Sequence, residues 1–232
     1  MLEVNKMLPQ IGCKIYKSEK MDRNVLREKL ETYREEKHQE GIYRPLIENV
    51  EEFSLLDNGV KFKFLYDYVV PIPYRDETQK ILRTANAEIK IIDPQGRNVY
   101  LIYAASKIAD SIRVRLSRIL SNSDDFIGNV GILPDVLKDI ESNDAIEVKY
   151  GWWDDIETYA RKGALKGNLS RSRYYTDFES SGKPTIITFE SQSTGRTIRI
   201  SSQGIVTFYG QNVTQQEIED YIMRIIIPRL RL

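Results

Sequence analysis

The chain has 232 residues, and its 34 Lys and Arg residues balance its 34 Asp and Glu residues, so the formal net charge is zero. A single Cys and a single His exclude an internal disulfide and a structural zinc site built from four thiolate or imidazole ligands. Zero net charge argues against a protein that binds polyanions over its whole surface, but it leaves room for a local basic patch.

The composition also bears on the compartment. The N-terminus lacks the apolar run and the small-residue cleavage site of a signal peptide, and no run of about 18 apolar residues occurs. The sequence therefore predicts a cytoplasmic protein without a membrane contact. Its many Glu, Lys, Arg and Ile residues, with few Cys and Met, are typical of thermophile proteins.

The first 41 residues are predicted to form an N-terminal arm and helix. Residues 1–20 have no clear periodicity, which indicates a flexible or loosely docked arm. Asp22 is a suitable cap for a helix that ends near Gln39. This helix is expected to pack on the rest of the chain or to contact a protein partner or a second copy. Its apolar stripe consists of Val25, Leu26, Leu30 and Tyr33.

Residues 42–121 are predicted to form a first half made of a sheet and a helix. Asp57-Asn58-Gly59 is a strong hairpin turn, and the alternating residues after it predict a strand that ends before Pro71 and Pro73. A short helix or loop is expected over 74–86. Two further strands flank the turn at 93–96, and an amphipathic helix follows over 108–119.

Residues 122–232 are predicted to form a second half of the same kind. A short helix over 133–140 and a strand within 145–153 precede an irregular segment, 154–182. Three strands follow, at 185–190, 197–201 and 205–209. A capping box, Thr214 to Glu217, opens the last helix, which ends at Pro228.

Hairpin-linked strands followed by a helix predict an α+β fold with two antiparallel sheet-and-helix halves. The halves end alike: residues 89–120 and 197–230 both predict strand, Gln-Gly turn, strand and helix. Each half also contains an Ile-x-Asn-Val tetrapeptide, at 47–50 and 127–130. These similarities indicate an internal repeat of one supersecondary unit.

The segment from Ile198 to Leu230 resembles the end of a repeat of the TATA-binding protein family. Gly204 and Gly210 keep the family's glycine spacing, and Ile227-Pro228-Arg229-Leu230 resembles the end of its long helix. The resemblance implies a saddle-like sheet backed by helices. It also implies that Asn49 and Asn129, in the two tetrapeptides, match Asn residues of the family's DNA-facing sheet.

Several features depart from the family, among them Ile205 in place of the Lys after the turn Gly and extra residues over about 154–182 in the second half. The Phe that wedges between base pairs is replaced by Ser201 in the second half and by Asp93 in the first. A Ser or an Asp cannot hold a duplex kinked as an inserted apolar side chain does. The resemblance therefore implies the fold, and it does not imply kinking of a TATA box.

A basic and aromatic segment, residues 152–175, is the predicted nucleic-acid contact. Basic groups neutralise phosphates and aromatic faces stack on bases. The alternative without a binding function is a solvated loop whose aromatic residues belong to the core. The candidate binding residues are Arg161, Lys162, Lys166, Arg171, Arg173 and Tyr174, with Asn49 and Asn129 from the resemblance.

No catalytic constellation, metal site or cofactor is predicted. His38 and Cys13 have no partner visible in the sequence, and Gly163 to Gly167 lacks the Gly-Lys-Ser/Thr ending of a phosphate loop. The aspartate pairs 124–125 and 154–155 lack a third metal ligand.

The sequence therefore favours a non-enzymatic protein that binds DNA or RNA or is linked to transcription. A protein-interaction or assembly module is the second hypothesis. A metal-dependent nuclease that uses the aspartate pairs is the third.

Overall fold

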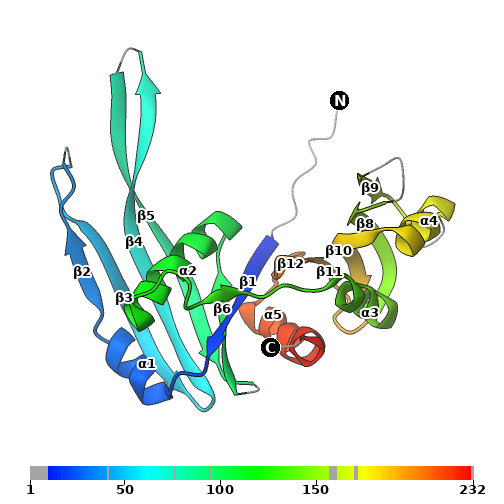
Figure 1. The fold of residues 1–232 in the computed structure, drawn as a ribbon, viewed down its shortest axis with the longest axis horizontal. Helices are drawn as coiled ribbons and strands as arrows, with labels where there is room; N and C mark the ends of the chain where they lie inside the picture. Colours follow the sequence, from blue (N-terminus) through cyan, green and yellow to red (C-terminus); the bar gives the residue numbers. More distant parts are fainter. Residues whose placement is uncertain are drawn as a thin grey trace. The chain divides into compact units, whose positions relative to one another are not determined.

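The computed structural model describes residues 10–40, 42–75, 77–94, 96–156, 161–169 and 172–230. Backbone contacts divide the chain into two compact units, which we call the N-unit (residues 16–128) and the C-unit (residues 129–232 with residues 1–15). Each unit combines helices with antiparallel strands, which confirms the α+β class (Figure 1). The limits at 41 and 121 stay a prediction, because compactness does not test whether a segment folds independently.

The N-unit contains a meander of strands between two helices. Its strands follow the order β2-β3-β4-β5-β6. The elements from the N-terminus to the end of this unit are β1 (Gln10–Glu19), α1 (Arg23–Leu30), β2 (Arg34–Lys37), β3 (Leu46–Leu56), β4 (Gly59–Tyr74), β5 (Glu77–Ile92), β6 (Arg97–Tyr103), α2 (Ser106–Ser121) and β7 (Gly128–Asn129).

From α3 onward, the C-unit has two strands, a second helix, three more strands and a last helix. Its sheet has the strand order β1-β12-β11-β10-β8-β9. Its elements are α3 (Pro134–Asp144), β8 (Ala145–Asp154), β9 (Lys162–Lys166), α4 (Arg173–Ser181), β10 (Lys183–Ser191), β11 (Thr197–Ser201), β12 (Ile205–Tyr209) and α5 (Gln215–Tyr221), which continues as a π-helical turn (Ile222–Ile226) and a 3₁₀ turn (Ile227–Arg229).

The prediction of an N-terminal arm followed by one long helix is wrong. Residues 10–19 form β1, whose first half pairs with β12 from Gln10 to Lys14. The helix ends at Leu30, and Arg34–Lys37 pairs with β3 as an edge strand. Local charge and propensity favoured a helix there, but pairing with a strand distant in sequence decided the conformation.

Three further predictions in the irregular regions are also wrong. Strand β4 continues through Pro71 and Pro73 to Tyr74, and the segment expected as a helix or loop belongs to β5. Proline is tolerated here because β3 pairs with β4 only as far as Tyr66, which leaves the outer half of β4 as an edge. The segment 154–182, expected to be irregular, contains β9 and α4.

Local signals with a defined geometry are confirmed. Asn58 lies in the two-residue turn between β3 and β4, whose last pair is Leu56 with Gly59. The Thr214 hydroxyl accepts from the amide of Glu217, and the Glu217 carboxylate accepts from the amide of Thr214, which completes the capping box. Gly96 and Gly204 each adopt a positive φ in the turns before β6 and β12.

In the N-unit, α1 and α2 cover one face of the sheet. Even-numbered residues of β4 and odd-numbered residues of β5 share this face because they pair directly, as Phe62 does with Ile89. Leu30 of α1 and Leu116 of α2 are fully buried against the same core. The other face carries the intervening residues, among them the charged Lys61, Lys63 and Asp67.

In the C-unit, helices also cover one face. Tyr221 of α5 packs edge-on against Phe208 of β12 at 5.5 Å between ring centroids. Trp153 of β8 contacts Phe178 of α4 at 5.5 Å, and α3 packs against β10. In the described part of the chain, no helix is both long and apolar enough to cross a membrane.

A buried carboxylate ties this helix layer to the sheet. Asp144, 5% exposed at the end of α3, accepts hydrogen bonds from the hydroxyls of Ser191 (2.7 Å) and Tyr221 (2.8 Å) and from the amide of Ser193 (2.9 Å). Burial, and after it Asp144, raises the pKa of Tyr221. The phenol therefore stays a donor at all physiological pH values.

We expect Asp144→Ala to lower the free energy of unfolding by about 3 kcal/mol, because it removes the acceptor of the Tyr221 and Ser191 hydroxyls and of the Ser193 amide. Asp144→Asn keeps an acceptor oxygen and should cost less than half of that. Urea denaturation of both variants measures the difference. Equal effects of the two substitutions would contradict a role for the acceptor.

Candidate nucleic-acid interface

The open face of the C-unit sheet carries a row of polar and aromatic side chains. Strand register places five residues from five strands on one line across the sheet, and all five are partly or fully exposed. On the opposite face of the sheet, the side chains of Trp153 and Phe208 are buried beneath the helices. The row runs Thr207, Arg199, Thr188, Tyr150 and Lys166, on β12, β11, β10, β8 and β9.

Tyr150 lies between two cations in this row. The Arg199 guanidinium carbon lies 5.9 Å from the centroid of the Tyr150 ring, a cation–π distance. On the other side, Lys166 is the direct cross-strand partner of Tyr150. Neither Arg199 nor Lys166 has an acidic partner among the residues that the structure describes. The row therefore offers one aromatic face and two uncompensated positive charges.

The neighbouring cations of this face are paired. Lys149 Nζ lies 2.9 Å from Glu190 Oε2, and Lys162 Nζ lies 3.9 Å from Asp154 Oδ1. Asp154 also accepts from the indole N–H of Trp152 at 3.2 Å. These pairs limit the positive field to the row itself.

The predicted basic segment is divided between two faces. Lys162 and Lys166 lie on β9, on the open face with Tyr150. Arg173 and Tyr174 are exposed on α4, the helix whose Phe178 packs on the opposite, buried face. The structure therefore does not bring these four residues together.

Two further predicted residues contribute no described contact to the open face. Arg161 is exposed next to β9, and its carbonyl oxygen accepts from the amide of Asp155 at 2.8 Å. Arg171 lies outside the described residues.

Asn49 and Asn129 do not occupy equivalent places. Asn49 lies in β3, after α1, and its amide donates to Glu51 at 3.0 Å. Asn129 is exposed in β7, before α3. Since one tetrapeptide follows the first helix of its unit and the other precedes it, the expected correspondence between the two asparagines fails.

The two positions that replace the family's Phe wedge are used in turns. Asp93 accepts from the amide of Gly96 at 2.7 Å and pairs with Lys20, also at 2.7 Å. Ser201, 8% exposed, accepts from the amide of Ile205 at 3.3 Å. Both side chains therefore close their turns and offer no apolar group for insertion between bases.

The residues that sequence reasoning missed are Tyr150, Arg199 and Thr188. Each lies in a predicted strand, and alternation alone would have placed them opposite the buried residues. Their common row depends on the register of β8 with β10 and of β10 with β11. No local signal in the sequence contains that register.

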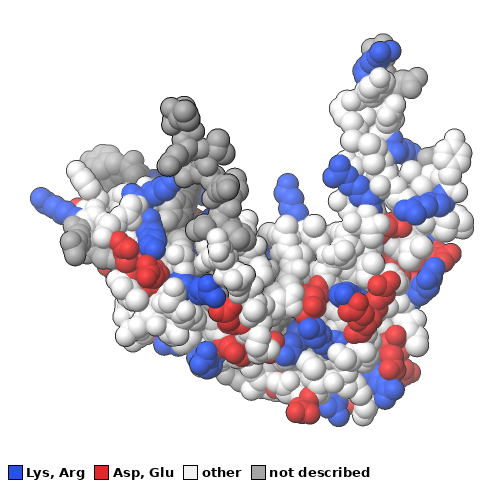
Figure 2. Space-filling view, turned by 180° about the vertical axis from the view of Figure 1, so that it is seen from behind, with Lys and Arg blue, Asp and Glu red and all other residues white. Residues whose placement is uncertain are grey.

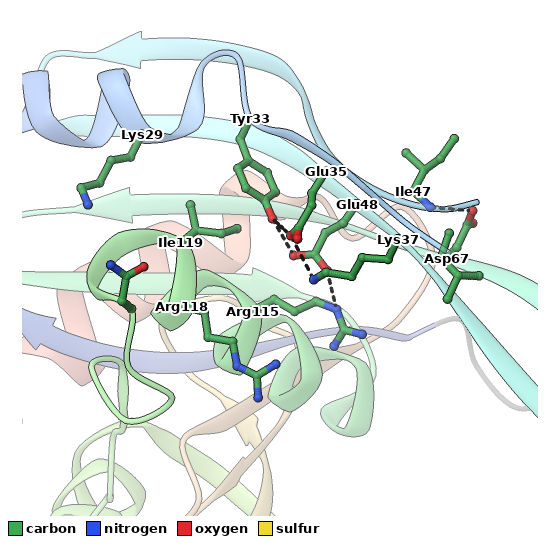
Figure 3. Close-up of a pocket in the computed structure, with 12 residues that line it drawn as sticks. Lys29, Tyr33, Glu35, Lys37, Ile47, Glu48, Asp67, Arg115, Arg118 and Ile119 are labelled. Carbon is green, nitrogen blue, oxygen red and sulfur yellow. Dashed lines mark hydrogen bonds and ion pairs between the residues drawn. The ribbon is translucent and has the colours of Figure 1, made fainter. Parts of the chain in front are cut away.

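The N-unit contains a hollow of about 500 Å³ between α1, β2, β3 and α2. Figure 3 shows the Tyr33 hydroxyl pointing at two carboxylates, Glu35 (2.9 Å) and Glu48 (3.1 Å). Arg115 Nε lies 2.9 Å from Glu48, and its guanidinium lies 4.1 Å over the Tyr66 ring. The pKa of Tyr33 is raised above its ordinary value, and burial is the largest cause. These contacts join α2 to β3, although Arg115 Nε meets Glu48 only as an ion pair and has no hydrogen-bond partner among the described residues.

Each aspartate pair weighed as a metal site has at least one carboxylate held by a cation. Asp124 pairs with Arg118, and Asp155 lies 2.8 Å from Lys183. Within the described ranges, no group of three or more His, Cys, Asp and Glu side chains gathers. Cys13 is fully buried, whereas His38 is exposed. The described side chains thus give little support to the nuclease hypothesis.

Comparison with known proteins identifies no family for the chain. No protein-family model matches the chain, and no curated protein sequence matches it.

A partly buried carboxyl lies where α3 meets α4, behind the open face. Lys138 donates to the Glu179 carbonyl at 2.7 Å across this contact. Burial, and after it the charge of Glu179, raise the pKa of Glu141 to about 7, while the charge of Lys138 opposes them. An unfolded Glu titrates near 4.3, so the folded chain binds more protons between about pH 4 and 7. The unfolding free energy should therefore fall as pH rises through this window.

Glu141→Gln removes this titration, so we expect the variant to be more stable than the unchanged chain above pH 7, by about 1–3 kcal/mol, and similar to it near pH 4. Urea denaturation at pH 4.5 and pH 8 measures the difference. Glu28→Gln, at an exposed position of α1, is the matched control and should show no such pH dependence. A parallel shift of both variants at both pH values would contradict the assignment.

Proposed function

We propose that the chain binds single-stranded nucleic acid on the open face of the C-unit. One observation carries this proposal: Tyr150 lies in a cross-strand row between Arg199 and Lys166, two cations without an acidic partner in the described part of the chain. An unpaired base can stack on the Tyr150 ring while the cations neutralise the phosphates on either side. Sheet faces with aromatic residues are a common platform for such binding.

The energetics favour this assignment over a solvated sheet face. Stacking of a base on an aromatic side chain is worth about 1–3 kcal/mol and tolerates any base. Arg199 and Lys166 need not break an ion pair before they meet a phosphate, whereas Lys149 and Lys162 must. Binding should therefore depend on salt with a small slope, since few phosphates are neutralised.

The element order supports the related-halves interpretation as part of the same proposal. In each unit a helix precedes antiparallel strands and another helix follows the last of them: α1 and α2 in the N-unit, α3 and α5 in the C-unit, where α4 also interrupts the strands. Gly96 and Gly204 adopt φ values of +76° and +74° in matching turns. We infer a fold similar to the TATA-binding family that binds without kinking, because Asp93 and Ser201 close turns instead of forming wedges.

We expect Tyr150→Ala to weaken binding of a mixed-sequence single-stranded oligonucleotide by about tenfold or more, through loss of stacking. The pair Arg199→Ala with Lys166→Ala should reduce the slope of log Kd against log salt by about 1–2. Fluorescence anisotropy between 50 and 200 mM salt, with DNA, RNA and duplex probes, measures both quantities.

Arg173→Ala with Tyr174→Ala on α4 is the matched control, since it removes the same residue types from the other side of the sheet. It should leave the affinity unchanged. Unchanged binding in the Tyr150 variant, or an equal loss in the α4 control, would refute the proposed site.

A further inference from the structure

The outer halves of β4 and β5 form a two-stranded ribbon. The register pairs β4 with β5 from Gly59 to Tyr74, but β3 pairs with β4 only as far as Tyr66, and β6 pairs with β5 only from Glu88 onward. The ribbon projects beyond the other strands of the N-unit (Figure 1), and Lys and Arg side chains lie at its tip and along its length (Figure 2). Among the described residues of the unit, the two edges of the ribbon therefore have no strand neighbour.

Prolines fix which backbone groups point out of the ribbon. Pro71 pairs with Lys80, and Pro73 pairs with Thr78. A hydrogen-bonded antiparallel pair needs an N–H from both residues, so both of these pairs must be of the non-hydrogen-bonded kind. The ring nitrogens of Pro71 and Pro73 therefore face the outer edge of β4, which lacks these two donors.

The outer edge of β5 is open by the same alternation. The residues that pair with odd-numbered positions of β4 direct both N–H and C=O away from β4. Further along, this same set includes Glu88 and Lys90, which β6 engages. The residues left without a strand partner in the described part of the chain are Thr78, Lys80, Leu82, Thr84 and Asn86.

Natural proteins usually protect long edges with prolines, bulges or inward charges. Here the prolines protect only β4. The one Lys on the β5 edge, Lys80, donates to the Glu40 carbonyl at 3.1 Å, so its side chain is held toward the segment before β3 and not across the edge. An unprotected edge of this length is a template for another strand.

We propose that the outer edge of β5 pairs antiparallel with the same edge of a second copy of this chain, about a two-fold axis at Leu82. In this register every outward-pointing residue of the β5 edge has a partner in the second copy: Thr78 pairs with Asn86, Lys80 with Thr84, and Leu82 with Leu82. Arg83 lies opposite Ile81, so no like charges meet. Pairing centred on Lys80 would place two Lys residues opposite each other, which is unfavourable.

The result is a four-stranded ribbon sheet shared by two copies, with an isologous interface. The interface is small, so the dimer forms at high chain concentration and dissociates on dilution. This assembly does not depend on nucleic-acid binding by the C-unit, and each is tested separately.

The test is sedimentation equilibrium of the full chain over a wide concentration range. We expect a monomer–dimer equilibrium for the unchanged chain, and Leu82→Pro should raise the dimer dissociation constant by about tenfold or more, because it removes one outward N–H from each copy. Val69→Pro is the matched control. Val69 pairs with Leu82 in the same rung, so this proline faces the β4 edge and should leave dimerisation unchanged.

A second measurement holds even if proline destabilises the ribbon. Leu82→Cys should form a disulfide-linked dimer on mild oxidation, because directly opposed strand residues lie within disulfide range. Val69→Cys should not, and Cys13 is fully buried. A chain that stays monomeric at all concentrations, a Leu82→Pro variant that associates as before, or equal cross-linking of both Cys variants would overturn the proposal.

Discussion

Helices cover one face of the sheet in each unit, and this one-sided burial determines what the other face can do. Phe62 and Ile89 in the N-unit, and Phe208 and Trp153 in the C-unit, are withdrawn from water by helices. Because successive strand residues point to opposite faces, the residues next to the buried ones in β11 and β12 lie on the open face, whereas consecutive residues of β6 are all buried. Tyr150 and Arg199 are partly exposed on the open face for this reason, and the Asp144 network keeps the helix layer of the C-unit in place.

The elements that could be predicted from the sequence are those with short-range causes. The turn at Asn58-Gly59, the capping box at Thr214 and the amphipathic spacing of α2 each involve residues within one or two turns of the chain. The wrong predictions concern segments whose conformation a distant partner decides. Residues 10–14 are a strand because β12 pairs with them, and residues 34–37 are a strand because β3 does. The local sequence of residues 10–14 and 34–37 contains no signal of these pairings.

The candidate site was accessible from the sequence only in part. Lys162 and Lys166 were found from their basic composition, but Arg173 and Tyr174, close to them in sequence, lie on the helix behind the sheet. Composition cannot separate the two pairs of residues. The edge strand β9 carries its lysines on the open face, and α4, which follows it within a few residues, covers the opposite face. Tyr150 was missed because its relation to Arg199 exists only through β10, which lies between β8 and β11.

The most direct test of the central claim, that nucleic acid contacts the open face of the C-unit, is to map that contact. Ultraviolet cross-linking of the full chain to a single-stranded oligonucleotide, followed by mass spectrometry, identifies the aromatic residues that touch bases. The account predicts cross-linked peptides from β8, at Tyr150. Cross-links confined to Tyr174 of α4, or to the N-unit, would contradict it.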